Sequence, residues 1–155
     1  VGLQIGAFAR IAREFPHARL QIVGEGPERA NLPRHDRVSF EGEQNDLRRF
    51  YEDADAFLLT SDSEGWGVVV TEAAAFRLPI IMTDVGCAGE FIKNGENGIV
   101  IPVGDEEVLV SAMKKVLTAA ALRARLAAAA SRSFLLLPTA QTAIQKQVEA
   151  WASFK

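Results

Sequence analysis

Short apolar runs alternate with helical patterns along most of this chain, and this alternation constrains the fold more than any other feature. Residues 56–60 and 80–83 are nearly all apolar, as expected for strands that are covered on both faces. A helical pattern at residues 68–76 lies between them. Strands that alternate with helices at this spacing predict a parallel sheet with right-handed crossovers. We therefore expect an α/β fold with helices on both faces of the sheet.

The same pattern extends along the whole sequence. We expect at least five strands, at residues 19–23, 37–40, 56–60, 80–83 and 98–102. We expect helices at residues 3–15, 46–54, 68–76, 90–93, 106–118, 120–134 and 139–154, with a further helix start at Pro27. Residues 119–130 are rich in alanine, the strongest helix former, and predict a helix on the solvent side.

Length and charge exclude several classes of protein. A chain of 155 residues fits one domain, which we place at residues 1–155. With 17 basic and 20 acidic residues, its net charge of −3 argues against binding nucleic acid by bulk electrostatics. One cysteine excludes an internal disulfide framework and favours a reducing compartment. We expect neither a signal peptide nor a membrane span, and we expect a piece of a larger protein because Val1 begins inside a helical pattern.

The strongest candidate site follows the strand predicted at residues 56–60, because ligands of open α/β sheets bind beyond the carboxyl ends of the strands. Gly65 and Gly67 stand at the start of the next helix, where they allow close backbone approach and leave N–H groups for an anion such as phosphate. Glu64 and Glu72 flank them and are suited to accept hydrogen bonds from sugar hydroxyls. The alternative is that Glu64 caps the helix and Glu72 is a surface residue.

Other candidates carry weaker signals. The turn at residues 24–26 lacks the third glycine of a dinucleotide fingerprint, so it is either a tight turn into a helix or the edge of a base pocket. Residues 84–90 indicate a turn or a helix start. Cys87 is expected to be a packing residue, since no histidine lies near it in sequence. His17 and His35 are isolated and lack the spacing of metal ligands.

Taken together, the motifs resemble one known family. Residues 54–73, which contain Glu64 and Glu72, resemble the Glu-x7-Glu signature of retaining GT-B glycosyltransferases, the group called glycosyltransferase family 4 or glycosyl transferases group 1. The flanking segments resemble strands and turns of the same family, in the same order, at residues 20–27, 38–42, 78–86 and 90–102. The resemblance covers about residues 2–118.

The resemblance implies a specific architecture and a specific site. The family has two Rossmann-like domains, and this chain resembles the C-terminal, donor-binding one without its first strand. By analogy, Glu64 is the candidate catalytic residue and binds hydroxyls of the donor sugar, while Glu72 binds the ribose hydroxyls. Further donor-binding candidates are Gly65, Trp66, Gly67 and Val68 near the sugar and diphosphate, and Gly24, Gly26 and Phe40 beside the base.

The resemblance also implies the partners. The substrate is a nucleotide-diphosphate sugar, with no further cofactor and no metal, and the acceptor is held by an N-terminal domain that this sequence lacks. That domain is also where we expect any peripheral contact with the inner face of a membrane, in a cytoplasmic enzyme of polysaccharide or glycolipid synthesis. The family carries an Arg and a Lys ahead of the position of Val1, so we expect residues 1–155 alone to be inactive and to bind nucleotide weakly.

Three alternatives stay open at this stage. One is a non-catalytic module that keeps the fold as a scaffold or regulatory partner. Another is a different GT-B enzyme, either a nucleotide-sugar epimerase, which the Glu-x7-Glu spacing disfavours, or a phosphorylase-like enzyme, for which no cofactor lysine site is evident. The third is a nicotinamide-binding domain, which the glycine pattern disfavours and for which Phe40-Glu41 is a poor match at the end of the second strand.

Overall fold

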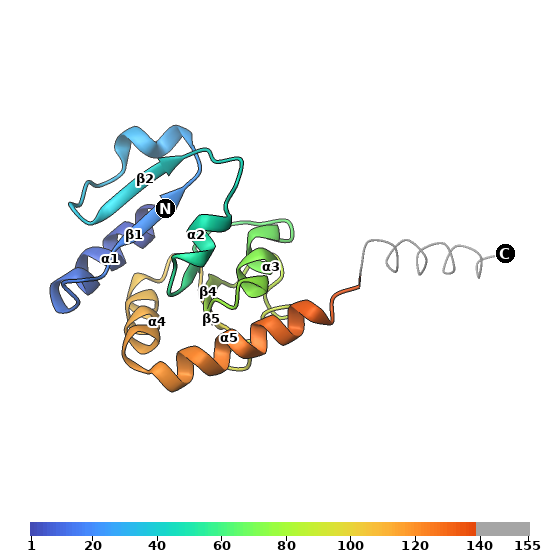
Figure 1. The fold of residues 1–155 in the computed structure, drawn as a ribbon. Coiled ribbons are helices and arrows are strands. Elements are labelled where there is room, and N and C mark those ends of the chain that lie inside the picture. The colour runs from blue at the N-terminus through green and yellow to red at the C-terminus, as the bar shows by residue number, and fades with distance from the viewer. Residues whose placement is uncertain (139–155) are drawn as a thin grey trace.

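The computed structural model describes residues 1–138, so the helix expected at residues 139–154 lies outside the described part (Figure 1). The helices are α1 (Gly2–Glu14), the 3₁₀ helix η1 (Pro27–Asn31), α2 (Arg48–Glu52), α3 (Val68–Ala75), α4 (Glu106–Thr118) and α5 (Ala120–Leu135). The strands are β1 (Leu20–Val23), β2 (Val38–Gly42), β3 (Phe57–Leu59), β4 (Ile80–Thr83) and β5 (Ile99–Ile101). No helix within the described residues is long and apolar enough to span a bilayer.

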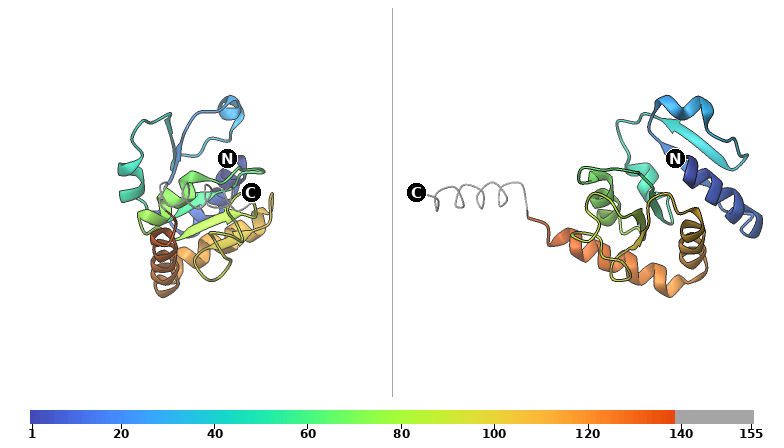
Figure 2. Two further views of the ribbon diagram at one scale, coloured as in Figure 1. Left: turned by 90° about the vertical axis from the view of Figure 1, so that its right-hand side faces the viewer. Right: turned by 180° about the vertical axis from the view of Figure 1, so that it is seen from behind.

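All strand pairs are parallel, which confirms the predicted α/β class. The strands form two sheets, however, and not the single sheet expected from the alternation. One sheet has the order β1-β2 and the other has the order β3-β4-β5. Figures 1 and 2 show the β1–β2 pair lying to one side of the three-stranded sheet. The division arises because β1 and β3 do not pair with each other.

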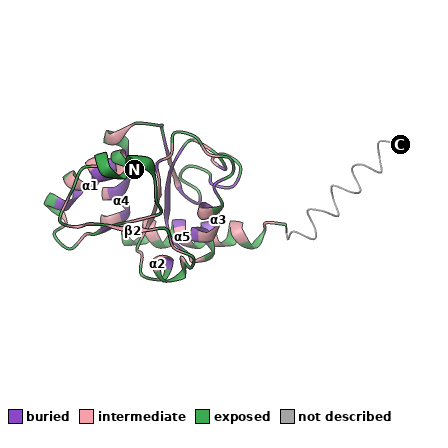
Figure 3. Cartoon of the chain, turned by 90° about the horizontal axis from the view of Figure 1, so that it is seen from above, coloured by how far each residue is buried: buried purple, intermediate pink, exposed green. Residues whose placement is uncertain are grey.

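Helices cover both faces of the three-stranded sheet, as expected, and β4 shows how the sequence directs this. Ile81 packs in a cluster with α1 and α4, whereas Ile80 and Met82 pack in a second cluster with α3 and α5. Successive side chains of a strand point to opposite faces, so one apolar strand contributes to both clusters. Figure 3 shows buried residues of α1 and α4 where these two helices face each other.

The two-stranded sheet is covered on one face only. Leu20, Ile22 and Phe40 pack with the α1 and α4 cluster. Gln21 and Ser39, which alternate with them, are exposed. The half-polar pattern of β1 and β2 is therefore typical of strands with one solvated face.

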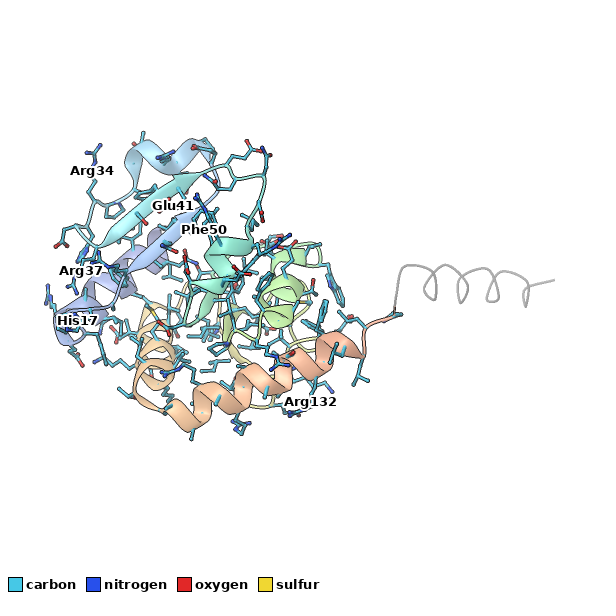
Figure 4. The ribbon with its side chains drawn as sticks, viewed as in Figure 1. His17, Arg34, Arg37, Glu41, Phe50 and Arg132 are labelled. Atoms are coloured by element: carbon cyan, nitrogen blue, oxygen red, sulfur yellow. The ribbon has the colours of Figure 1, made fainter. Side chains whose placement is uncertain are left out.

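Arg37, at the start of β2, ties this sheet to the end of α1. Its guanidinium donates through Nη1 to the carbonyl of Phe15 (3.0 Å) and through Nη2 to that of Ala12 (2.6 Å). Figure 4 labels Arg37 beside the end of α1. The last carbonyls of a helix lack partners within it, and a basic side chain there satisfies them and also interacts favourably with the helix dipole.

Two expected elements differ from the structure. Residues 90–93 form a turn and not a helix, because Gly89 adopts a left-handed conformation (φ 81°) and its N–H donates to Ile92 O (2.8 Å). The chain therefore makes a single turn, in which Phe91 N donates to Cys87 O (2.9 Å), and does not continue as a helix. The alanine-rich α5 is not only a solvent-side helix, since Leu126 and Ala130 are fully buried.

Asn97 connects the turn at residues 91–98 to α5 through hydrogen bonds. It is one of the few buried polar residues in the described part of the chain. Its Nδ2 donates to the carbonyl of Phe91 (2.8 Å) and to Ser133 Oγ on α5 (2.9 Å), while its Oδ1 accepts from the N–H of Lys93 (2.7 Å). One amide side chain thus satisfies two backbone groups and one hydroxyl.

We predict that Asn97→Ala lowers the free energy of unfolding by about 3 kcal/mol, because the Phe91 carbonyl and the Lys93 amide lose their partner in a buried turn. Urea denaturation followed by circular dichroism measures this. The matched control is Asn45→Ala in an exposed loop, which should change stability by less than about 0.5 kcal/mol. A loss at Asn97 as small as that of the control contradicts the assigned role.

Candidate functional site

The loop after β3 enters α3 without a side-chain cap. Gly67 is the N-cap residue of α3, in a left-handed conformation (φ 81°), and no side chain of the described residues caps the first turn. The N–H of Val70 donates to Gly67 O (2.8 Å), and the first N–H groups of a helix otherwise have no partner within it, so those of residues 68 and 69 are left for water or a ligand. Such a helix terminus, with glycine beside it, is suited to hold an anion.

Glu64 lies in this loop and is half-buried. Its Oε1 accepts a hydrogen bond from Ser61 Oγ (2.7 Å). Because no side chain caps α3, the alternative that Glu64 serves as the helix cap is wrong. The Ser61 bond instead fixes the carboxylate within its own loop.

Glu72 lies further along α3 and is also half-buried. Its Oε2 accepts from the hydroxyl of Tyr51 on α2 (2.8 Å). The Tyr51 ring is buried and stacks on Phe76 with centroids 5.2 Å apart. The buried phenol therefore sets the direction of the Glu72 carboxylate, and Glu72 is half-buried and not the surface residue of the alternative interpretation.

The environment of Tyr51 keeps its hydroxyl protonated. Burial raises the pKa of the phenol well above its ordinary value of about 10, and the hydrogen bond to Glu72 raises it further. The hydroxyl therefore acts as a donor to Glu72 over the whole physiological pH range.

The loop after β4 lies directly against the Glu64 loop. Gly86 has a φ of 57°, and a Cβ there would meet Glu64 Cβ and Trp66 O, each at 3.0 Å. Cys87 N donates to Trp66 O (3.1 Å), and Thr83 Oγ1 donates to Ser61 O (2.7 Å). Residues 84–90, expected to be a turn or a helix start, thus form a turn that supports the loop carrying Glu64.

Cys87 is fully buried, and burial raises the pKa of its thiol. A buried thiol with a raised pKa is a poor nucleophile. This confirms the expectation that Cys87 is a packing residue.

The structure distributes the remaining candidates between two places. Gly65, Trp66 and Val68 are exposed beside Glu64, and the Trp66 side chain lines an open depression together with Lys93 and Arg132. Residues 24–26 lie on the other sheet, in the exposed loop after β1. The Gly24 conformation (φ 117°) accounts for the glycine at that position.

Phe40 lies within β2 and not at its end, because the strand continues to Gly42. It is half-buried, and the Arg29 guanidinium carbon lies 5.7 Å from the centre of its ring. A position beside a base would therefore bring the ligand close to Arg29 as well as Phe40.

Sequence reasoning missed Ser61 and Tyr51 as partners of the two glutamates. Ser61 carried a weak signal, since it lies three residues before Glu64 in the same loop. Tyr51 gave no sequence signal for this contact beyond its position on an apolar helix face. It lies 21 residues from Glu72, and only folding brings the two residues together. Within residues 1–138, no three His, Cys, Asp or Glu side chains are grouped to hold a metal ion, and the expectation of a metal-free site stays a prediction.

The fold matches solved glycosyltransferases over most of the chain. The C-terminal domain of a glycosyl transferase group 1 protein, LpcC from Francisella tularensis, superposes with a TM-score of 0.75 at 21% identity, covering 85% of this chain and 75% of that one. HepE from Anabaena, solved with UDP-glucose, gives a TM-score of 0.82 at 22% identity, covering 97% of this chain and 44% of that one. These likenesses define the fold as that of a GT-B C-terminal domain, a Rossmann-like α/β unit.

Sequence comparison identifies the family. Residues 1–133 match the family described as "Glycosyl transferases group 1". The chain is 34% identical over 130 residues to the lipopolysaccharide core biosynthesis glycosyltransferase LpsE of Rhizobium meliloti, covering 79% of this chain and 37% of LpsE. It is 39% identical over 108 residues to the N-acetyl-alpha-D-glucosaminyl L-malate synthase of Bacillus anthracis, covering 65% of this chain and 28% of that enzyme.

The chain therefore belongs to the glycosyl transferases group 1 family. It spans about a third of the length of these two relatives.

The raised pKa of Tyr51 gives a direct test of the Tyr51–Glu72 pair, because Tyr51 is the only tyrosine in the sequence. We predict that phenolate absorbance shows no ionisation near pH 10 while the chain is folded, whereas the chain unfolded in guanidinium chloride titrates at about 10. A folded pKa above the unfolded one means that this contribution to stability is complete below about pH 10 and is lost as pH rises above it.

Tyr51→Phe is the matched control, since it keeps the ring and removes the titrating group. It should lack this part of the alkaline loss of stability. Reversible ionisation near pH 10 in a chain that circular dichroism shows to be folded contradicts the buried, hydrogen-bonded state of Tyr51.

Proposed function

We propose that this chain is the donor-binding domain of a retaining glycosyltransferase and holds a nucleotide-diphosphate sugar for transfer to an acceptor. The observation that carries the proposal is the arrangement after β3. Two carboxylates, Glu64 and Glu72, are each fixed by a hydroxyl donor on either side of an uncapped helix N-terminus. Carboxylates accept from hydroxyls, and helix N-termini favour phosphate, so the two halves of a sugar nucleotide each meet suitable chemistry.

The proposed role of each group follows from whether it is a negatively charged acceptor or an N–H donor. Glu64 binds hydroxyls of the donor sugar close to the reacting carbon, and Glu72 binds the ribose hydroxyls. The N–H groups of residues 65–68 face the sugar and the diphosphate. The loop after β1, with Gly24 and Gly26, and Phe40 on β2 flank the base.

In the proposed reaction, transfer proceeds with retention through a transition state with oxocarbenium character, as in other glycosyl chemistry. A second domain supplies the acceptor, and closure of the two domains excludes water from the reacting bond. The proposal requires neither a metal nor a further cofactor. It places the enzyme in the cytoplasm, with any membrane contact made by the second domain.

The ligands and names of similar proteins support this choice of ligand. Two structures of HepE hold UDP-glucose, or UDP and glucose, and the pneumococcal O-GlcNAc transferase GtfA was solved with UDP and GlcNAc. LpsE is named for lipopolysaccharide core synthesis, and a 34% identical relative from Mycobacterium tuberculosis is named a glycogen synthase. UDP is therefore the first ligand to test, and synthesis of a polysaccharide or glycolipid is the setting we propose.

We predict that UDP, added to the isotopically labelled chain, shifts the backbone amide signals of residues 65–68 and of Glu72 in NMR spectra. Glu72→Gln should weaken this binding about tenfold or more, because it removes a charged acceptor for the ribose hydroxyls. Glu96→Gln, in an exposed turn, is the matched control and should bind as the unchanged chain does. Equal binding by both variants, or shifts confined to other surfaces, contradicts the proposed site.

We also predict that calorimetry of residues 1–155 with UDP shows no submicromolar site. The reason is electrostatic: two carboxylates lie beside the diphosphate position, and the resemblance to the family places the Arg and Lys that offset diphosphate charge ahead of Val1. The comparison is a chain extended to include those two residues, which should bind more tightly. Submicromolar binding by residues 1–155 contradicts this prediction.

A further inference from the structure

Thr83, the last residue of β4, carries a hydroxyl at a position where apolar packing alone would suffice. Its side chain is inaccessible to solvent, and it is one of the few buried polar residues in the described part of the chain. Valine has nearly the same shape and packs at such a position without the cost of burying a hydroxyl. The hydroxyl of Thr83 is therefore accounted for by the contact that it makes.

The Thr83 hydroxyl lies near two carbonyl oxygens of the neighbouring strand and loop. Thr83 Oγ1 is 2.7 Å from Ser61 O and 3.5 Å from Leu59 O. A hydroxyl has one proton to donate, and bonds between two oxygens are commonest at about 2.7 Å. The proton is therefore donated to Ser61, the second residue after the end of β3.

This bond extends the connection between β3 and β4 beyond their paired residues. The last pair of the two strands is Leu59 with Met82. Among residues 1–138, the backbone of Ser61 makes no hydrogen bond to another backbone group. The Thr83 hydroxyl thus holds the start of the loop where the backbone ladder has ended.

Ser61 in turn holds Glu64. Ser61 Oγ donates to Glu64 Oε1 (2.7 Å), and Oε2 of the same carboxylate has no hydrogen bond within the described residues. One oxygen of Glu64 is therefore fixed, and the other is left for a ligand. Two hydrogen bonds of 2.7 Å, joined through one serine, connect β4 to the Glu64 carboxylate.

The stem of Glu64 lies against the loop that follows Thr83. A Cβ on Gly86 would lie 3.0 Å from Glu64 Cβ, so the two loops touch at this point. The Cβ of Glu64 is therefore placed by this contact, and the bond from Ser61 sets the direction of its carboxylate.

We propose that Thr83 is a positioning residue: its hydroxyl fixes Ser61, and Ser61 directs the Glu64 carboxylate at a hydroxyl of the donor sugar. This inference rests on the proposed function, in which Glu64 binds that sugar. Hydrogen bonds depend on direction, so an acceptor displaced by about 1 Å binds a sugar hydroxyl much less tightly. Thr83 itself is buried and acts through Ser61 without touching the sugar.

The first experiment measures the carboxyl carbon signal of Glu64 by NMR in variants of residues 1–155 at constant pH. Thr83→Val removes the donor and keeps the packing, so the signal should move in the same direction as in Ser61→Ala. Thr83→Ser keeps the donor but removes a methyl group, so it should lower the stability slightly and leave the signal in place. The matched control is Thr118→Val, which removes the bond from an exposed hydroxyl to Lys114 O and should not move the signal.

The second experiment titrates the same variants with UDP-glucose and with UDP. Thr83→Val should weaken the binding of UDP-glucose about fivefold or more and change the binding of UDP by less than about twofold, because only the sugar contact depends on Glu64. Thr83→Ser and Thr118→Val should bind both ligands as the unchanged chain does.

The inference is overturned if Thr83→Val leaves the Glu64 signal in place, or if Thr83→Ser moves it as far as Thr83→Val does. Equal weakening of UDP and UDP-glucose binding by Thr83→Val also overturns it, because that result indicates a general loss of structure. If Thr83→Val does not fold, Thr83→Ala removes the same donor and is judged by the same outcomes.

Glu64→Gln separates this inference from the proposed function. Weaker binding of UDP-glucose by Glu64→Gln, with no effect of Thr83→Val, overturns the positioning role alone. If Glu64→Gln binds UDP-glucose as the unchanged chain does, Glu64 does not hold the sugar, and both the proposed function of this site and the positioning role fail.

Discussion

Burial of β4 is the constraint on which the rest of the structure depends. All four of its residues are almost completely inaccessible to solvent, so every backbone N–H and C=O of this strand needs a partner within the protein. β3 and β5 provide these partners in parallel register. Its side chains then require an apolar layer on each face, which α1 with α4 and α3 with α5 supply. The carboxyl ends of β3 and β4 consequently open at the same edge.

The arrangement of the candidate site follows from that edge of the sheet. The loops after β3 and β4 emerge side by side, and the glutamates take their orientation from hydroxyls on neighbouring segments, Ser61 and Tyr51. Among residues 1–138, neither glutamate forms an ion pair.

Much of the fold was predictable because local patterns and tertiary packing agree. The bounds of β4 and α4 were predicted as the structure has them. β4 is a short apolar run, which is typical of a buried strand, and α4 is a capped amphipathic pattern, which is typical of a helix. The structure of residues 90–93 was not predicted correctly, because the left-handed conformation of Gly89 overrides the helical propensity of these residues. A single sequence does not reveal which glycines adopt that conformation.

The division into two sheets could not be predicted either, since strand pairing is long-range and depends on which neighbours are present. The same limit applies to the site. The Glu64 and Glu72 spacing was visible in the sequence, but contacts between distant segments, such as Tyr51 with Glu72, arise only in the folded chain.

The contact between the loops that follow β3 and β4 has a consequence for how this edge can vary. Thr83 and Cys87 bond to backbone carbonyls of the neighbouring loop, and Gly86 leaves no room for a side chain against it. An insertion or deletion in either loop would break these bonds or open a gap, unless the other loop changed length with it. Variation at this edge is thus confined to exchanging side chains, or to changing both loops together.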